Sequence, residues 1–358
     1  MRSRVGRATT AAVLGGLLAA GCGSGSGDKA SSAAGKDSES TAGFPVTVTD
    51  CAGAETTFTS APKRIVTSNA SSLELLLRLG AGDKVIGTGF PPGKGTLPGR
   101  LDARAQQVEV LSDTVIPKEK LLGSGADLYI DTFASMNMGG GMGDAPTEEE
   151  FAAAGIKHTF LKSTACAAMS KSPVTDLTAV EDDITSLGAV TGTTAKAKEL
   201  VDGMRSKVDA VRRAVGGTPE SERPTYFFFD HDAGTKQPMA VCNRQVAHAV
   251  ITLAGARNVF ADCDGDYQQV GWEDVIARNP DWIQLGVRDR GSESANDKAF
   301  DEARKWLESN SATKGLKAVK EGHFLRIGSE QTTIAGVSNA DTVESIAQTL
   351  YPGRVGRR

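Results

Sequence analysis

Short apolar segments alternate with helical segments along most of this chain of 358 residues. The apolar stretch from Arg64 to Thr67 is followed by Ser71-Ser72-Leu73-Glu74, a capping-box pattern that predicts the start of a helix. Similar strand-and-helix units of roughly 30 residues recur up to Leu161, and again from Thr225 to Ile327. This alternation is typical of an α/β fold in which helices flank mainly parallel sheets.

A strandless stretch separates the two runs of units. From Asp176 to Gly216 apolar side chains recur at helical spacing, although Thr191-Gly192-Thr193 is a place where a helix could kink or break. The pattern predicts two α/β lobes joined by one long helix. The expected boundaries are 44–175 for the N-terminal lobe, 176–216 for the connecting helix and 217–358 for the C-terminal lobe.

The first 22 residues resemble the signal of an exported bacterial lipoprotein. Three arginines precede a short apolar stretch, Ala8 to Ala20, which ends at Gly21-Cys22 and is too short to span a bilayer. The signal predicts that residues 1–21 are removed and that Cys22 carries lipid at the outer face of the cytoplasmic membrane. The alternative is a plain secretory peptide with an incidental cysteine. Residues 22–43 are rich in Gly, Ser, Ala and Thr, which predicts a flexible tether.

The charge balance excludes one class of partner. The chain has 40 Lys and Arg against 44 Asp and Glu, and residues 1–21 hold three arginines and no acid, so the processed chain is more negative still. A protein without a basic excess is not expected to bind nucleic acid.

Four cysteines remain once Cys22 is assigned to lipid, and four cysteines allow three pairings. Two lie in each half of the chain, and two separate cores would permit one bridge in each. We therefore expect Cys51 to pair with Cys166 and Cys242 with Cys263. The alternative, a zinc site, has no ligand spacing to support it.

Two helix-to-strand segments share one spacing. Each glutamate is followed, at the same interval, by an aspartate at which a strand begins. The pairs are Glu119 with Asp127 and Glu273 with Asp281. The two glutamates should therefore occupy equivalent places on the two lobes. The alternative is that both are solvated acids that stabilise helix N-termini.

Together these segments resemble the substrate-binding lipoproteins of ABC importers for iron-siderophore complexes and cobalamin. The likeness is carried by Arg64 to Gly80, by the Glu119 and Glu273 segments and by Asn258-Val259-Phe260, and it runs from about Phe44 to about Leu350. It implies a rigid receptor of the class III periplasmic-binding-protein type, and we expect a monomer. It also implies that Glu119 and Glu273 dock onto arginines of the permease, which a separate ATPase powers.

Open α/β sheets bind ligands outside the carboxyl ends of their strands. Between the lobes, this rule and the neighbouring segments nominate Ser68, Asn69, Ser71, Phe90, Phe133, Ser135, Met136, Asp230, His231, Arg244, Trp272, Arg288, Arg290 and Gln331. Arg288 and Arg290 could pair with a carboxylate, a catecholate or a phosphate. The alternative for each arginine is an ordinary surface charge.

Several motifs fail as enzyme, metal or cofactor sites. The loop 89–96 lacks the spacing and the hydroxyl of a phosphate loop and is interpreted as a turn-rich cleft loop. The acids from Asp262 to Glu273 lack the glycine of a calcium loop. Met136, Met138 and Met142 could hold Cu(I), but flexible methionines more often line a cleft. We expect no catalytic residue, no metal site and no cofactor.

The expected function is capture of a metal chelate, most simply a ferric siderophore, for an ABC permease. Cobalamin remains an alternative ligand. So does a deazaflavin cofactor precursor, because a branch of the resembled family with paired cysteines and a Phe-Ala-Ser loop, here Phe133-Ala134-Ser135, includes members assigned to its uptake. An enzyme or redox lipoprotein is the remaining alternative. Aromatic residues make up 5% of the chain, which disfavours a cleft built to stack haem.

Overall fold

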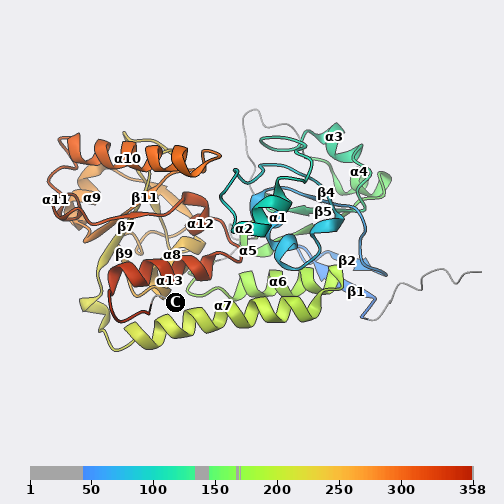
Figure 1. Cartoon of the computed structure of the whole chain (residues 1–358), viewed down its shortest axis with the longest axis horizontal. Helices are drawn as coiled ribbons and strands as arrows, with labels where there is room; N and C mark the ends of the chain where they lie inside the picture. Colours follow the sequence, from blue (N-terminus) through green and yellow to red (C-terminus); the bar gives the residue numbers. More distant parts are fainter. Residues whose placement is uncertain (1–42, 134–144, 167–168, 170, 357–358) are drawn as a thin grey trace, which may run out of the picture. The chain divides into compact units, whose positions relative to one another are not determined.

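Two four-stranded parallel sheets with the same strand order organise the structure (Figure 1). The first, the sheet of the N-terminal lobe, has the order β4-β3-β5-β6 and consists of β3 (Ile65–Thr67), β4 (Val85–Thr88), β5 (Leu128–Asp131) and β6 (Lys157–Phe160). The second, the sheet of the C-terminal lobe, has the order β9-β7-β11-β12 and consists of β7 (Thr225–Asp230), β9 (Arg257–Asn258), β11 (Trp282–Gly286) and β12 (Phe324–Arg326). In both sheets, the strand that comes first in the chain, β3 or β7, lies between the second and the third.

The computed structural model describes residues 43–133, 145–166, 169 and 171–356, all within one compact unit of the chain that begins at Thr41. The lipidation candidate Cys22, the predicted signal and almost all of the predicted tether lie outside these residues. So do Ser135, Met136, Met138 and Met142. Within the described part of the chain, no helix is long and apolar enough to cross a membrane.

Helices cover the sheets of both lobes. Those of the N-terminal lobe are α1 (Ala70–Arg78), α2 (Gly99–Ala105), α3 (Lys118–Leu122), α4 (Glu148–Ala153) and α5 (Lys162–Ala165). Those of the C-terminal lobe are α8 (Val246–Leu253), α9 (Trp272–Arg278), α10 (Glu293–Ser309), α11 (Lys317–Glu321), α12 (Ser329–Thr333) and α13 (Asn339–Leu350). Two antiparallel pairs complete the fold, β1 (Val46–Thr49) with β2 (Glu55–Phe58), and β8 (Met239–Val241) with β10 (Tyr267–Gln269). The predicted α/β architecture is confirmed.

The strand β7 shows why the C-terminal sheet is buried on both faces. Its sequence Tyr226-Phe227-Phe228-Phe229 is a continuous apolar run, as expected for a central parallel strand, and all four rings are at most 2% exposed. Alternate side chains point to opposite faces. Tyr226 belongs to the same apolar cluster as α13, whereas Phe227 belongs to the cluster that contains α10.

The connection between the lobes consists of two helices. A single helix over 176–216 is wrong, because Gly192 adopts a left-handed backbone (φ 74°) that ends α6 (Thr178–Thr191), and α7 (Thr194–Val215) then runs back beside it (Figure 1). The crossing is tight, since a Cβ atom on Gly188 would lie 2.3 Å from that of Ala197. The longer helix, α7, makes the connection, because it packs against α6 on one side and against α13 and α8 of the C-terminal lobe.

One apolar cluster is continuous from lobe to lobe through α7. It includes Leu73 and Ile130 of the N-terminal lobe, Val211 of α7, and Val250 and Val343 of the C-terminal lobe, all of them fully buried. Closely packed interiors deform little. The arrangement therefore favours small movements of one lobe against the other.

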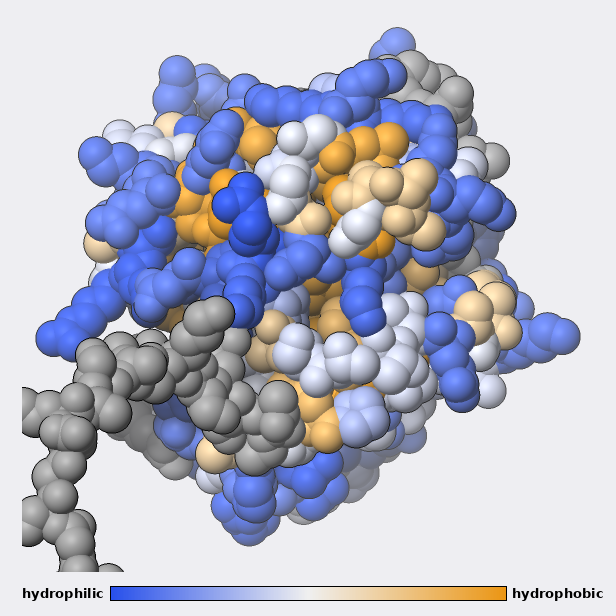
Figure 2. All heavy atoms as spheres, turned by 90° about the vertical axis from the view of Figure 1, so that its right-hand side faces the viewer, coloured by the Kyte–Doolittle hydropathy of each residue, from blue (hydrophilic) through white to orange (hydrophobic). Residues whose placement is uncertain are grey.

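Both disulfides have the predicted pairing. Cys51 is bonded to Cys166 with 5.3 Å between the Cα atoms, and this bridge ties the β1-β2 turn to the end of α5. Cys242 is bonded to Cys263 with 5.0 Å between the Cα atoms, within the C-terminal lobe. Figure 2 views the molecule from the side on which β1, β2 and α4 lie in Figure 1, and apolar groups there form small areas separated by hydrophilic side chains.

Candidate functional site

The polar residues that follow β3 form a buried network in the N-terminal lobe. The Ser68 hydroxyl lies 2.8 Å from the Thr132 hydroxyl, which also accepts a hydrogen bond of 2.9 Å from Asn69 Nδ2. Asn69 Oδ1 accepts from the Ser72 amide at 3.0 Å and caps α1. Ser68 and Asn69 are 2% and 4% exposed. Ser68 and Asn69, both predicted to contact a ligand, therefore connect β3, β5 and α1, and little of their surface is accessible to a ligand.

Two aromatic rings lie at the same edge. The ring centroids of Phe90 and Phe133 are 5.5 Å apart with the rings tilted by 59°, and both side chains are partly exposed. Phe90 has a positive φ of 34°, which is unusual for a residue other than glycine. Its carbonyl accepts from the Ala70 amide, whereas Asp131 Oδ1 accepts from the Phe133 amide at 2.7 Å. Backbone strain of this kind is concentrated at functional sites.

Charged groups dominate the carboxyl edge of the C-terminal sheet. After β7, Asp230 Oδ1 accepts from the amides of Asp232 and Ala233, each at 3.1 Å. Asp232 forms an ion pair with Arg290 and accepts from the Arg288 amide at 2.7 Å. His231 lies beside the same carboxylate, with 4.0 Å between Nδ1 and Asp232 Oδ1.

Partial burial perturbs two carboxyl groups at this edge. Desolvation raises the pKa of Asp230, although the amide of Ala233 and the charge of Arg288 act against it. Desolvation likewise raises the pKa of Glu330 on α12, whose Oε1 accepts from the Asp289 amide at 3.2 Å. Both groups therefore lie where water stabilises a negative charge poorly.

Two hydrogen bonds hold these edges against each other. Gly93, in the turn-rich loop 89–96 of the N-terminal lobe, donates its amide to Asp289 Oδ2 at 2.7 Å. Ser71 on α1 donates its hydroxyl to the Ala335 carbonyl at 2.9 Å. A Cβ atom on Gly93 would lie 2.1 Å from Asp289 Oδ2, so only glycine fits this approach. The carboxyl edges of the two lobes thus face each other. Ser71, predicted as a ligand contact, forms part of this contact between the lobes.

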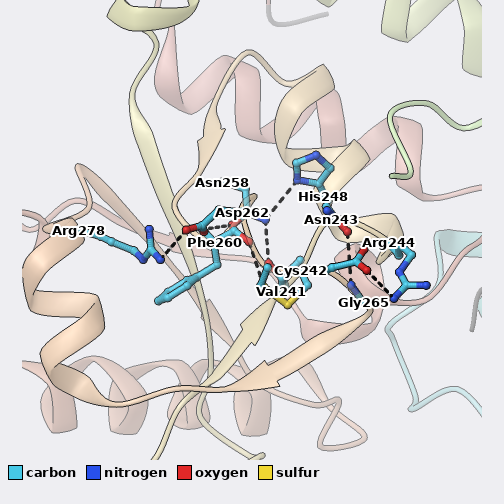
Figure 3. The surroundings of a disulfide bond; sticks show 12 residues. Val241, Cys242, Asn243, Arg244, His248, Asn258, Phe260, Asp262, Gly265 and Arg278 are labelled. Carbon is cyan, nitrogen blue, oxygen red and sulfur yellow. Dashed lines mark hydrogen bonds and ion pairs between the residues drawn. A yellow bond between two sulfur atoms is a disulfide. The ribbon is translucent and has the colours of Figure 1, made fainter. Parts of the chain in front are cut away.

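Three other predicted ligand residues have structural partners. Trp272 is 8% exposed, donates its indole N–H to the Thr235 carbonyl at 2.8 Å and packs against Phe229 and Trp306. Arg244 forms an ion pair of 3.2 Å with Asp264 beside the Cys242–Cys263 disulfide (Figure 3). Gln331 is exposed, and its Oε1 accepts from the Gly328 amide at 3.3 Å, capping α12.

Sequence reasoning missed Tyr267, a residue of β10. Its side chain is 42% exposed, and its hydroxyl accepts a hydrogen bond of 2.8 Å from Gln245 Nε2. Desolvation of the hydroxyl raises the pKa of Tyr267, and the nearby charges of Asp230 and Asp266 raise it further. The sequence held a signal, since Tyr267 stands where a calcium loop beginning at Asp262 requires glycine. Asp232, Asp289 and Glu330 were missed as well.

A cavity of about 600 Å³ lies away from these edges. Its walls include Thr225, the first residue of β7, so it opens at the amino end of that strand, whereas Asp230 lies at the carboxyl end. Three guanidinium groups line it, but Arg278 pairs with Asp262, and the Nε atoms of Arg223 and Arg257 donate to backbone carbonyls. Among the residues that the structure describes, no group of three or more His, Cys, Asp or Glu side chains is arranged to hold a metal ion.

Glu119 and Glu273 occupy equivalent positions in the two lobes. Each is the second residue of a short helix, α3 or α9, each is exposed, and each helix leads into the third strand of its sheet. Asp127 accepts from the amide of Arg64 at 3.0 Å, and Asp281 accepts from the amide of Thr225 at 2.8 Å, so both aspartates tie the third strand to the first. The predicted equivalence of position is confirmed.

Two equivalent lobes whose strand ends face each other define a two-lobed solute-binding protein. Residues 65–331 match the periplasmic binding protein family, and the chain belongs to that family.

Similar proteins are known from several prokaryotes. An uncharacterized ABC transporter substrate-binding lipoprotein of Bacillus subtilis, YvrC, is 25% identical over 355 residues, 98% of each chain. A cobalamin-binding protein of Halobacterium salinarum is 26% identical over 254 residues, 70% of this chain and 61% of that protein. Among solved structures, a periplasmic binding protein from Veillonella parvula has a TM-score of 0.71 and 26% identity, and the match covers 86% of this chain and 97% of that one.

Proposed function

We propose that this protein captures a ferric siderophore or a similar metal chelate between its lobes and delivers it to the permease of an ABC importer. The observation that carries the proposal is the facing of two equivalent carboxyl edges, joined by the Gly93–Asp289 and Ser71–Ala335 hydrogen bonds. Membership of a binding-protein family supports a role in transport. The ligand would contact the aromatic pair Phe90 and Phe133 on one side and the charged edge after β7 on the other.

We further propose that lipid on Cys22 anchors the protein at the outer face of the membrane. The arginine-rich start, the short apolar stretch and the small residues before Cys22 support this, as does the relative from Bacillus subtilis, which is named a lipoprotein. In this proposal residues 1–21 are a signal peptide, 22–43 a tether, 44–175 and 217–358 the lobes, and 176–216 their helical connection.

Glu119 and Glu273 are proposed to contact the permease, one from each lobe. Their equivalent positions support this, because a partner with two similar halves would meet the same acid on each lobe. Exposed opposite charges at an interface mainly steer and orient the partner. The docking role is therefore separable from ligand binding.

Isothermal titration of the full chain in detergent tests the ligand class. We expect at least one of two ferric siderophore classes, trihydroxamate or tricatecholate, to bind with micromolar affinity or better, and cyanocobalamin to bind weakly. Cobalamin is the second candidate, because one relative is named a cobalamin-binding protein. Tight binding of cyanocobalamin without binding of either ferric chelate would replace the siderophore by this alternative.

A transport assay tests docking. Glu119→Lys and Glu273→Lys together should lower uptake of the bound chelate by at least tenfold while leaving its affinity within about twofold. Glu149→Lys is a matched control, since Glu149 is also an exposed acid at the second position of a short helix, α4. Equal loss of uptake in the control, or lost affinity in the double variant, would contradict the docking role.

A further inference from the structure

The arginines nominated to hold an anionic ligand already have carboxylate neighbours. Arg290 forms an ion pair with Asp232, and Arg244 forms one with Asp264. The guanidinium of Arg288 lies close enough to Asp230 and Glu330 to lower the pKa of each against the dominant effect of burial. The local positive charge is therefore balanced before any ligand arrives.

Carboxylates outnumber guanidinium groups at this edge. The acids are Asp230, Asp232, Asp264, Asp266, Asp289 and Glu330, against the arginines Arg244, Arg288 and Arg290 and two lysines, Lys236 in the loop after β7 and Lys94 in the facing loop 89–96. Desolvation also raises the pKa of Asp266, and its buried Oδ1 has no hydrogen-bond partner among the described residues. The edge is thus net negative.

Partly buried acids of this kind favour a ligand that brings positive charge. Asp230 and Glu330 are incompletely solvated, so a nearby cation would replace the lost hydration. The aromatic side chains act in the same direction, because the rings of Phe90, Phe133 and Tyr267, all at least partly exposed, can contact a cation. An anionic chelate would instead meet repulsion that the paired arginines do not offset.

We propose that the ligand has no net negative charge and places a cationic or neutral hydrogen-bond-donating group against Asp230 and Glu330. This rests on the proposed function, in which the facing strand ends bind the ligand. Within that function it selects one class of chelate, a cationic or neutral one such as a ferric trihydroxamate with a free ammonium arm. Anionic chelates, such as ferric tricatecholates, are selected against.

A series of three ferric trihydroxamates tests the charge requirement. The parent carries an ammonium arm, the N-acetyl derivative is neutral and the N-succinyl derivative is anionic, whereas the iron centre is the same in all three. Titration calorimetry should give affinities that fall about tenfold at each step from cation to neutral to anion. Equal affinities, or tightest binding of the anion, would overturn the proposal.

Isosteric variants locate the effect. Both amides that bind Asp230 donate to one oxygen, Oδ1, so Asp230→Asn can keep these bonds, and Glu330→Gln can likewise keep its bond from Asp289. Together the two variants should reduce the preference for cation over anion at least threefold. Asp202→Asn, an exposed site on α7, is the control and should leave the preference unchanged. An undiminished preference in the double variant would overturn the assignment to these two acids.

A failure of the proposed function can be distinguished from a failure of the charge requirement. If none of the three trihydroxamates binds, the ferric trihydroxamates are excluded as the ligand of the proposed function. The charge requirement is then read from the small molecule that co-purifies with the chain from its native host, identified by mass spectrometry. A molecule with net negative charge at pH 7 overturns the inference, and a neutral or cationic one supports it.

Discussion

Asp183 is a buried carboxyl group whose ionisation should make the protein less stable as the pH rises. It is 5% exposed on α6, and its two oxygens accept from the amides of Lys162 and Ser163 at 2.9 Å each, at the start of α5. Desolvation raises its pKa from 3.8 to about 6, and the hydrogen bonds to Ser163 and Lys162 offset this only in part. Here burial outweighs hydrogen bonding.

The sign follows from proton binding in the two states. Below pH 3.8 the group is protonated in both the folded and the unfolded chain. Between 3.8 and about 6 the unfolded chain releases the proton while the folded chain keeps it, so the free energy of unfolding falls as pH rises. Above this window the loss is complete, and its size is about 3 kcal/mol at ~1.36 kcal/mol per pH unit.

Denaturant unfolding of the wild type and of Asp183→Asn between pH 4 and pH 8 measures this loss. The amide cannot accept both backbone hydrogen bonds, which adds an offset that is independent of pH. The stability of the wild type relative to the variant should therefore fall by about 2 kcal/mol between pH 4 and pH 7, because part of the full loss of about 3 kcal/mol has already occurred by pH 4. Asp182→Asn, at the exposed neighbouring position, is the control. A difference that stays constant, or that increases with pH, would refute the dominance of desolvation.

The remaining predictions concern the disulfides and the contact between the lobes. In the chain-entropy model, removal of the Cys51–Cys166 bridge (separation 115) lowers the free energy of unfolding by about 4.8 kcal/mol, and removal of the Cys242–Cys263 bridge (separation 21) by about 3.3 kcal/mol. Paired serine variants compared by chemical denaturation should show this ranking, and the reverse ranking would contradict it. Gly93→Ala should push the loop away from Asp289, so amide exchange in the loop should rise at least tenfold. Gly203→Ala, with open space around it, is its control, and unchanged exchange in Gly93→Ala would argue against the contact.

The sheet architecture was predictable because local signals and burial agree. A capping box formed by Thr147 and Glu150 is present at the start of α4. At α1 the sequence allows two boxes, and the structure uses Asn69 with Ser72 in place of Ser71 with Glu74. The box of Ser71 with Glu74 does not form, because Glu74 is 8% exposed and forms an ion pair of 2.6 Å with Arg78, one turn later. Sequence cannot distinguish such overlapping caps, since tertiary packing selects between them.

The strand ends were predictable as a site, but their charge was not. The carboxyl-edge rule places Asp230, Arg288 and Arg290 together without any contact information. The partner that neutralises Arg290 lies 58 residues earlier in the chain, on the loop after a neighbouring strand. Pairings of this range depend on strand order and loop conformation. The sequence therefore left Arg290 available to an anionic group of the ligand, whereas in the structure Arg290 already pairs with Asp232.

The continuous core and the contacts at the strand ends together constrain how a ligand enters. Rotation of the lobes would disrupt an apolar cluster that runs through α7. Displacement of the loop 89–96 breaks the hydrogen bond from Gly93 to Asp289 and a few hydrogen bonds within the N-terminal lobe, such as that from Ala70 to Phe90. A net intramolecular hydrogen bond contributes about 1 kcal/mol, but each buried aliphatic side chain contributes about twice that or more. Opening at the loop is therefore the less costly path. It also leaves the equivalent positions of Glu119 and Glu273 unchanged, so the loaded and empty protein would present the same two acids to the permease.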